Sequence, residues 1–124
     1  MDTTKHPLRH AIDESAVSAA VAGIGERSRV NSLAARFALL AEPGRLALLL
    51  AMHRAGPISV TDLALATGMR DTTVSHALRL LRTAGTVSAS RTGRVVRYQL
   101  NDPEVVQLLD GTAGSARADV QHQG

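Results

Sequence analysis

The chain has 124 residues, 44% of them hydrophobic and 20% charged, which is the composition of one small globular domain. It contains no cysteine, which excludes disulfides, thiolate metal ligands and thiol nucleophiles, and its longest apolar stretch, residues 46–52, is far shorter than the ~20 residues that cross a bilayer. The formal net charge is +3, but residues 70–97 hold six arginines and one acidic residue, so this window carries +5 and the remainder −2. We therefore expect a cytoplasmic protein with no membrane partner and one basic face. Such a face is typical of phosphate binding, although an ordinary solvated surface explains the charge equally well.

Three helices are predicted in the first half of the chain. Apolar residues at helical spacing over residues 17–24 predict the first helix, with Gly23 and Gly25 at its end. A second helix is predicted near residues 32–41. A third begins with Pro43 at its first position and ends at Gly56. The predicted apolar stripe of the third helix consists of Leu46, Leu49, Leu50 and His53.

Two helices joined by a glycine turn are predicted next. Ser59 with Asp62 three residues later is the signature of a capping box, which starts a short helix. Thr67 and Gly68 are expected to make the turn after residue 66, and Asp71 is expected to be the N-cap of a longer helix that runs to about residue 84. The apolar positions of the longer helix lie on one side, and they are Val74, Ala77, Leu78 and Leu81.

A β-hairpin and a last helix complete the predicted elements. After the longer helix the apolar period changes from 3.6 to 2, which predicts a hairpin whose tip is residues 91–94, where the glycine can take a positive φ. Asn101 or Asp102 then caps a helix that has Pro103 at its first position. Gly111 is expected to end this helix.

This order of elements predicts a mainly α-helical fold with a β-hairpin wing, that is, a winged helix-turn-helix. We expect one folded domain at residues 13–110. A flexible N-terminal arm at residues 1–12 precedes it, and a flexible C-terminal tail at residues 111–124 follows it.

The second helix of the pair is expected to enter the major groove with its polar face outward, because small hydroxyl side chains allow close approach to base edges. This predicted recognition face consists of Thr72, Thr73, Ser75, His76 and Arg79. Arg91, Arg94 and Arg97 lie on or beside the wing, where arginine suits phosphate contact or insertion into a minor groove. Each feature alone is more typical of a solvated surface. Their joint occurrence in this order favours double-stranded DNA as the partner.

Five segments of the chain together carry a family pattern. They are residues 40–46 (LAEPGRL), 60–64 (VTDLA), 74–85 (VSHALRLLRTAG), 91–94 (RTGR) and 98–100 (YQL). These segments closely resemble the ArsR/SmtB family of small repressors, and the resemblance covers about residues 33–110. The spacing Val-Ser-His-x-Leu-x-x-Leu-x-x-x-Gly, followed by a Gly-Arg wing and a Tyr-x-Leu strand, makes the resemblance specific.

The resemblance implies a homodimer, paired through its first and last helices, that represses a promoter and leaves it when an effector binds. The domain at residues 13–110 would then serve both DNA binding and dimerisation. Its operator would be a palindrome with half-sites about one helical turn apart.

Effectors in this family are often metal ions, and residues 60–109 look similar to the nickel- and cobalt-sensing actinobacterial branch. The chain departs from the family pattern, because it lacks cysteine and has Ser115 and Ala118 where later ligands of the last-helix site would stand. The remaining candidate ligands for divalent zinc, nickel or cobalt are His6, His10, Asp102, Glu104 and His122. His53 is expected to be a partly buried packing residue, and His76 to belong to the recognition face.

Two alternatives stay open beside a metal-responsive repressor. One is a repressor of the same type with a non-metal effector or none. The other is a winged helix that binds proteins and has little affinity for DNA, although such a module would not need clustered arginines. An enzyme is not expected, because the sequence has neither a glycine-rich phosphate loop nor a Ser/His/Asp or Cys/His constellation at a recognisable spacing.

Overall fold

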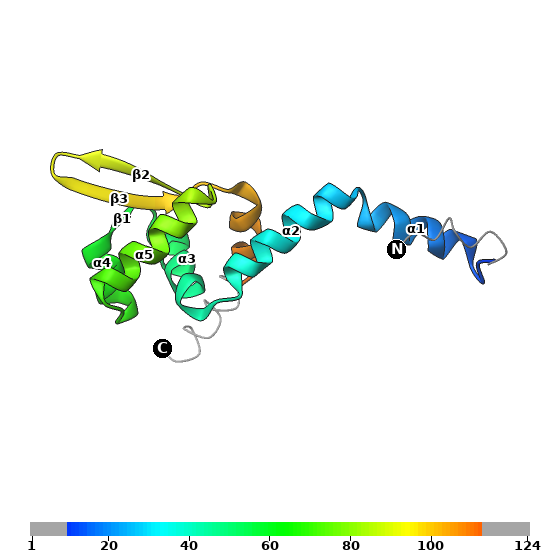
Figure 1. Cartoon of the computed structure of the whole chain (residues 1–124), viewed down its shortest axis with the longest axis horizontal. Helices are drawn as coiled ribbons and strands as arrows, with labels where there is room; N and C mark the ends of the chain where they lie inside the picture. The colour runs from blue at the N-terminus through cyan, green and yellow to red at the C-terminus, as the bar shows by residue number, and fades with distance from the viewer. Residues whose placement is uncertain (1–9, 113–124) are drawn as a thin grey trace. The chain divides into compact units, whose positions relative to one another are not determined.

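The computed structural model describes residues 10–112, which divide into two units at the junction of Ala35 and Arg36 (Figure 1). The first unit contains α1 (Glu14–Ile24) and the start of α2 (Arg27–Leu40). The second contains the end of α2 and then α3 (Pro43–Ala55), β1 (Ile58–Ser59), α4 (Val60–Thr67), α5 (Asp71–Thr83), β2 (Val87–Thr92), β3 (Val95–Leu100) and a helix at residues 103–112. In the described part of the chain, no helix is both long and apolar enough to cross a membrane.

Helix α1 has well-formed ends although it buries none of its residues. The Asp13 carboxylate accepts a hydrogen bond from the Ala16 amide at 3.1 Å and so caps the N-terminus. Of the two glycines predicted to end the helix, Gly25, with φ of 72°, does so, whereas Gly23 lies inside the helix. Helix α2 begins at Arg27, earlier than the predicted start near residue 32, because its first turn is mostly polar and gives no apolar periodicity to detect.

The hydrophobic core lies in the second unit, between the helices and the sheet. Its buried large residues are Leu48, Leu49, Met52, Leu63, Val74, Leu78, Leu81, Val87, Val105 and Leu109. The predicted stripe of α3 is partly wrong, since Leu50 is exposed whereas Leu48 and Met52 are buried. The reason is that α3 contacts α4, α5 and β3, so more than one of its sides is covered.

The sheet has three antiparallel strands in the order β1-β3-β2. The predicted hairpin is confirmed as β2 and β3, and Thr92 pairs with Val95, so the two-residue turn is Gly93-Arg94. Gly93 has φ of 63°, as the turn requires. The sequence did not predict β1, because a two-residue strand carries too short a pattern and forms only by pairing with β3. In Figure 1 the hairpin tip extends beyond α4 and α5.

The ends of α4 and α5 agree with the sequence only in part. The Ser59 hydroxyl accepts a hydrogen bond from the Asp62 amide at 3.2 Å, so Ser59 is the N-cap of α4 as predicted. The prediction of Asp71 as the N-cap of α5 is wrong. Arg70 is the N-cap and makes no side-chain capping bond, while Asp71 is the first helical residue, where its negative charge interacts favourably with the helix dipole.

The last described helix starts as predicted but does not stop where expected. Asp102 caps it, because its carboxylate accepts a hydrogen bond from the Glu104 amide at 3.1 Å. Gly111 was expected to end this helix, and that is wrong, since the helix continues to residue 112. A glycine inside a helix costs only about 1 kcal/mol relative to alanine, which is too little to end a helix by itself.

Candidate nucleic-acid interface

Helices α4 and α5 form the helix-turn-helix, and local contacts fix the turn between them. Gly68 ends α4 in the left-handed conformation, with φ of 76°, and Thr67, which was expected in the turn, is the last residue of α4. The Thr67 hydroxyl donates to the Leu63 carbonyl at 2.7 Å and accepts from the Met69 amide at 3.3 Å. Because α4 and α5 also contact each other, the turn and the packing together set the direction in which α5 leaves.

The outer face of α5 carries the predicted recognition residues. Thr72, Thr73, Ser75, His76 and Arg79 are all exposed, whereas Val74, Leu78 and Leu81 on the inner side are buried. None of the five exposed side chains has a hydrogen-bond or ion-pair partner within residues 10–112. They are therefore available to base edges and phosphates, and their role as DNA contacts stays a prediction.

The N-terminus of α5 adds backbone donors to this face. Since Arg70 makes no side-chain capping bond, the first amides of α5 are not satisfied by the N-cap side chain. Free amides at a helix N-terminus, together with the helix dipole, favour an anion such as a backbone phosphate.

The wing arginines do not form a single group. Arg94 lies in the turn, while Arg91 pairs with Val96 and Arg97 pairs with Ser90. Paired residues point to the same side of a hairpin and neighbours alternate, so Arg91 shares the side of Val96 and Arg97 lies on the opposite side. All three arginines are exposed, and two of them lie on opposite sides of the wing.

A hollow of about 400 Å³ lies between α5 and β3. It is lined by Ser75, Leu78, Arg79, Arg82, Thr83 and Tyr98. Two guanidinium groups and three hydroxyl groups therefore surround it, which is the set of donors that binds phosphate oxygens. The sequence analysis did not assign Arg82, Thr83 or Tyr98 a site role. The spacing of Ser75, Arg79 and Arg82 on one helix face was a signal that could have found Arg82.

Of the five candidate metal ligands, three lie within the described residues. His6 and His122 lie outside the described residues, and His10 is exposed. Asp102 and Glu104 lie together at the start of the helix at residues 103–112. In the described part of the chain, no group of three or more His, Asp or Glu residues is placed to hold a metal ion.

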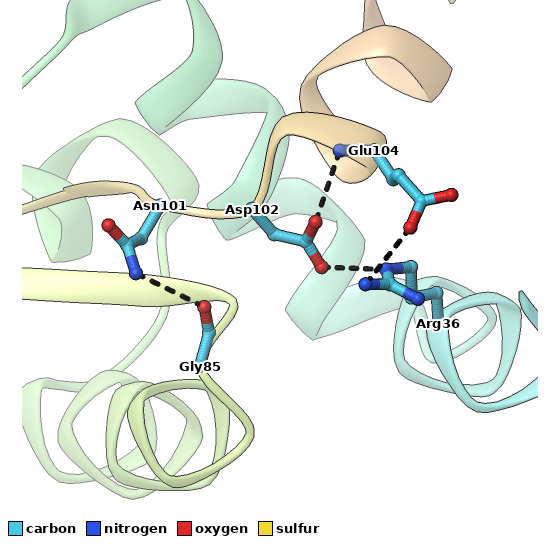
Figure 2. Close-up of polar contacts among 5 residues, drawn as sticks. All are labelled: Arg36, Gly85, Asn101, Asp102 and Glu104. Atoms are coloured by element: carbon cyan, nitrogen blue, oxygen red, sulfur yellow. Dashed lines mark hydrogen bonds and ion pairs between the residues drawn. The ribbon is translucent and has the colours of Figure 1, made fainter. Parts of the chain in front are cut away.

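An arginine already engages the two carboxylates (Figure 2). Arg36 Nε lies 2.7 Å from Asp102 Oδ2, and Arg36 Nη2 lies 3.1 Å from Glu104 Oε1. The hydrogen bond to Asp102 is the main cause that raises the pKa of Arg36 above its ordinary value. Because the described residues place a guanidinium between these carboxylates, Asp102 and Glu104 as they stand do not fit a divalent metal ion.

His53 is partly buried, as predicted, and has a polar partner that the sequence did not show. Its Nε2 lies 2.7 Å from Asp110 Oδ1, which links α3 to the helix at residues 103–112. This pairing occupies one of the two ring nitrogens of His53.

Known proteins of similar sequence and structure are transcriptional regulators. A family model described as "Bacterial regulatory protein, arsR family" matches residues 42–89. The HTH-type transcriptional regulator NmtR of Mycobacterium tuberculosis is 52% identical over 71 residues, which make up 57% of this chain and 58% of that protein. The chain thus spans less than two thirds of the length of this curated relative.

Two solved structures resemble the fold closely. The crystal structure of AntR, an antimony-specific transcriptional repressor, has a TM-score of 0.66 and 32% identity, over 80% of this chain and 87% of that one. The homodimeric winged helix-turn-helix DNA-binding domain from Mycobacterium bovis has a TM-score of 0.58 and 30% identity, over 79% of this chain and 94% of that one. The predicted winged helix-turn-helix fold is therefore confirmed. The similar proteins are named as regulators and not as enzymes, in agreement with the sequence analysis.

Proposed function

This chain belongs to the ArsR family of bacterial regulatory proteins, and we propose that it is a sequence-specific DNA-binding repressor that acts as a homodimer. The observation that carries the proposal is the outer face of α5, where five polar side chains are exposed and have no partner within residues 10–112. A helix of this kind, held by a helix-turn-helix, reads base edges in the major groove. We propose that the protein acts in the cytoplasm, where bacterial DNA lies.

Base reading and phosphate binding fall to different parts of the proposed interface. Thr72, Thr73, Ser75, His76 and Arg79 would reach the major groove from α5. Arg91, Arg94 and Arg97 on the wing, together with Arg82 beside the hollow, would contact phosphates on either side. Phosphate contacts supply salt-dependent affinity, whereas base contacts supply the preference for one sequence.

The homodimer part of the proposal is supported by the apolar surface of the first unit. Val17, Val21 and Ile24 of α1 expose 49%, 63% and 57% of their surface. Large apolar residues gathered on one helix face mark an interaction surface. We assign this face to a second copy of the chain, because the similar domain from Mycobacterium bovis is homodimeric.

A binding titration with salt variation tests the proposal directly. Fluorescence anisotropy would compare the duplex upstream of the chain's own coding region with a random duplex of equal length. We expect the upstream duplex to bind at least ~1,000-fold more tightly, with a palindromic footprint. Equal and weak affinity for both duplexes would overturn the proposal and favour a protein-interaction module.

Release by an effector is the second part of the proposal. A metal ion is one candidate class, since the similar repressor AntR is antimony-specific. Asp102 and Glu104 are bound to Arg36, so a metal ion would have to act at other residues or displace this arginine. The same titration repeated with zinc, nickel and cobalt tests the effector. A loss of DNA affinity of about tenfold, equal to about 1.4 kcal/mol of coupling, would identify the ion, and no change would leave a non-metal effector or none.

A further inference from the structure

The start of the helix at residues 103–112 is joined to α2 by a side-chain network that is long-range in sequence. Arg36 and Asp102 are 66 positions apart, and their side chains meet at 2.7 Å. Both side chains are largely shielded, with 23% of Arg36 and 14% of Asp102 exposed. Figure 2 shows Arg36 facing both carboxylates from α2.

Both carboxylate oxygens of Asp102 accept a hydrogen bond. Its Oδ2 accepts from Arg36 Nε, and its Oδ1 accepts from the Glu104 amide at 3.1 Å. Glu104 Oε1 accepts from Arg36 Nη2 at 3.1 Å. A divalent ion bonded to these oxygens would have to displace the guanidinium, because the two positive charges would otherwise stand a few ångströms apart in a partly shielded site.

We propose that Arg36 is the resident cation of the Asp102–Glu104 pair, which ties α2 to the last described helix, and that a divalent metal ion can bind these two carboxylates only when Arg36 has left. The link between the two helices is therefore built into the chain and needs no bound ion. Arginine suits this role because it stays charged at any physiological pH and its planar fork can donate to two carboxylates at once.

The proposal is tested with three forms of the full chain and two NMR readouts. The forms are the parent chain, Arg36→Met, which keeps much of the aliphatic length without the charge, and Arg36→Met combined with Asp102→Asn and Glu104→Gln. Ni²⁺ or Co²⁺ is added in steps below one equivalent, because paramagnetic ions shift or broaden nearby amide signals even when binding is weak. Amide hydrogen exchange of residues 104–109 is followed in the absence of metal.

We expect the amides of residues 102–106 to be unaffected by the ion in the parent chain, perturbed in Arg36→Met, and again unaffected in the triple variant. Exchange of the 104–109 amides should be faster in Arg36→Met by about threefold or more, since the last helix loses its tie to α2. Perturbation of the 102–106 amides in the parent chain would overturn the proposal, and so would an Arg36→Met chain that shows neither new metal contact nor faster exchange.

The test does not depend on the DNA titration. A parent chain that fails to bind DNA can still show the Arg36-dependent pattern, and a chain that represses normally can still lack it. Retained dispersion of the amide spectrum outside residues 100–112 separates a specific change in Arg36→Met from general unfolding.

Discussion

Helices α1 and α5 both carry apolar residues at helical spacing, yet within the described chain they end in opposite environments. In α5, Val74, Leu78 and Leu81 are buried to within about 1% exposure, whereas α1 buries no residue at all. The same helical spacing of apolar residues therefore occurs in two situations. It can mark a face that packs inside the chain, or a face left for a second copy, and the pattern alone does not tell them apart.

The largest expected effect is a loss of stability from a substitution in the buried face of α5. Leu78→Ala should lower the free energy of unfolding by ~2–5 kcal/mol, because it leaves a cavity in the core. Leu65→Ala makes the same chemical change at a residue that is 78% exposed, and should change the free energy of unfolding by no more than ~0.5 kcal/mol. Urea denaturation followed by circular dichroism measures both. Equal losses would show that α5 is not anchored as described.

A charged substitution tests the exposed apolar face of α1. Val21→Asp should weaken self-association at least tenfold, about 1.4 kcal/mol, because a carboxylate would be buried without a partner in the dimer. Ala19→Asp, on the opposite face of α1, introduces the same residue and should leave the dimer intact. Sedimentation velocity over a range of concentrations distinguishes the two. A dimer that tolerates both changes would mean that α1 is not part of the interface.

The polar side of α5 sharpens the comparison further, since α1 has no such basic face. Arg82→Gln should weaken binding to specific and random duplexes alike, and reduce the slope of log affinity against log salt by ~0.9, the value for one phosphate. The matched control is Arg54→Gln, an exposed arginine on α3, which should leave the slope unchanged. Anisotropy at four or more salt concentrations gives the slopes.

The wing offers a smaller contrast of the same kind. Arg91 shares its side of the hairpin with Val96 and Tyr98, and Tyr98 lines the hollow beside α5, whereas Arg97 lies on the other side. We expect Arg91→Gln to weaken DNA binding more than Arg97→Gln does. Competition between the two variants and the parent chain for one labelled duplex ranks them, and the reverse order would place the DNA on the other side of the wing.

The smallest effect concerns a helix cap, which forms locally whether or not the helix is buried. The pKa of Glu42 lies below its ordinary value of 4.5, because its carboxylate accepts hydrogen bonds from the Arg45 and Gly44 amides. A lowered pKa in the folded state means that the cap stabilises fully above pH 4.5 and is lost as the pH falls through the lower folded value. Glu42→Gln should therefore flatten the acid side of a melting-temperature profile, and an unchanged profile would contradict the cap.

Local signals let the sequence predict much of the fold. Ser59 as a cap, Gly25 and Gly68 as helix ends and the Gly93 turn all act over a few residues, and the structure has them. Strand β1 could not be predicted, because its two residues have strand geometry only through pairing with β3. The buried side of α3 was misjudged for a similar reason, since a helix covered on several sides has no single stripe.

The candidate site divides in the same way. The recognition face of α5 follows from helical periodicity alone, and Arg82 could have been added by the same spacing argument. The hollow could be found only from the structure, because one of its lining residues, Tyr98, lies on β3 and the others lie on α5. The tie between Arg36 and Asp102 joins residues 66 positions apart, and no local rule connects them.

Asn101 connects the start of the last described helix to the base of the wing through its hydrogen bonds. Its amide donates to the Thr86 carbonyl at 2.8 Å, and its side chain reaches the Gly85 carbonyl at 3.5 Å (Figure 2). These hydrogen bonds join Asn101, the residue before Asp102, to the base of the wing. The Thr86 amide in turn donates to the Leu81 carbonyl of α5. Asn101 and Asp102 are adjacent, so no residue separates these hydrogen bonds from the Arg36–Asp102 ion pair. Contacts at two consecutive residues thus connect the start of the last described helix with α2, the root of the wing and the end of α5.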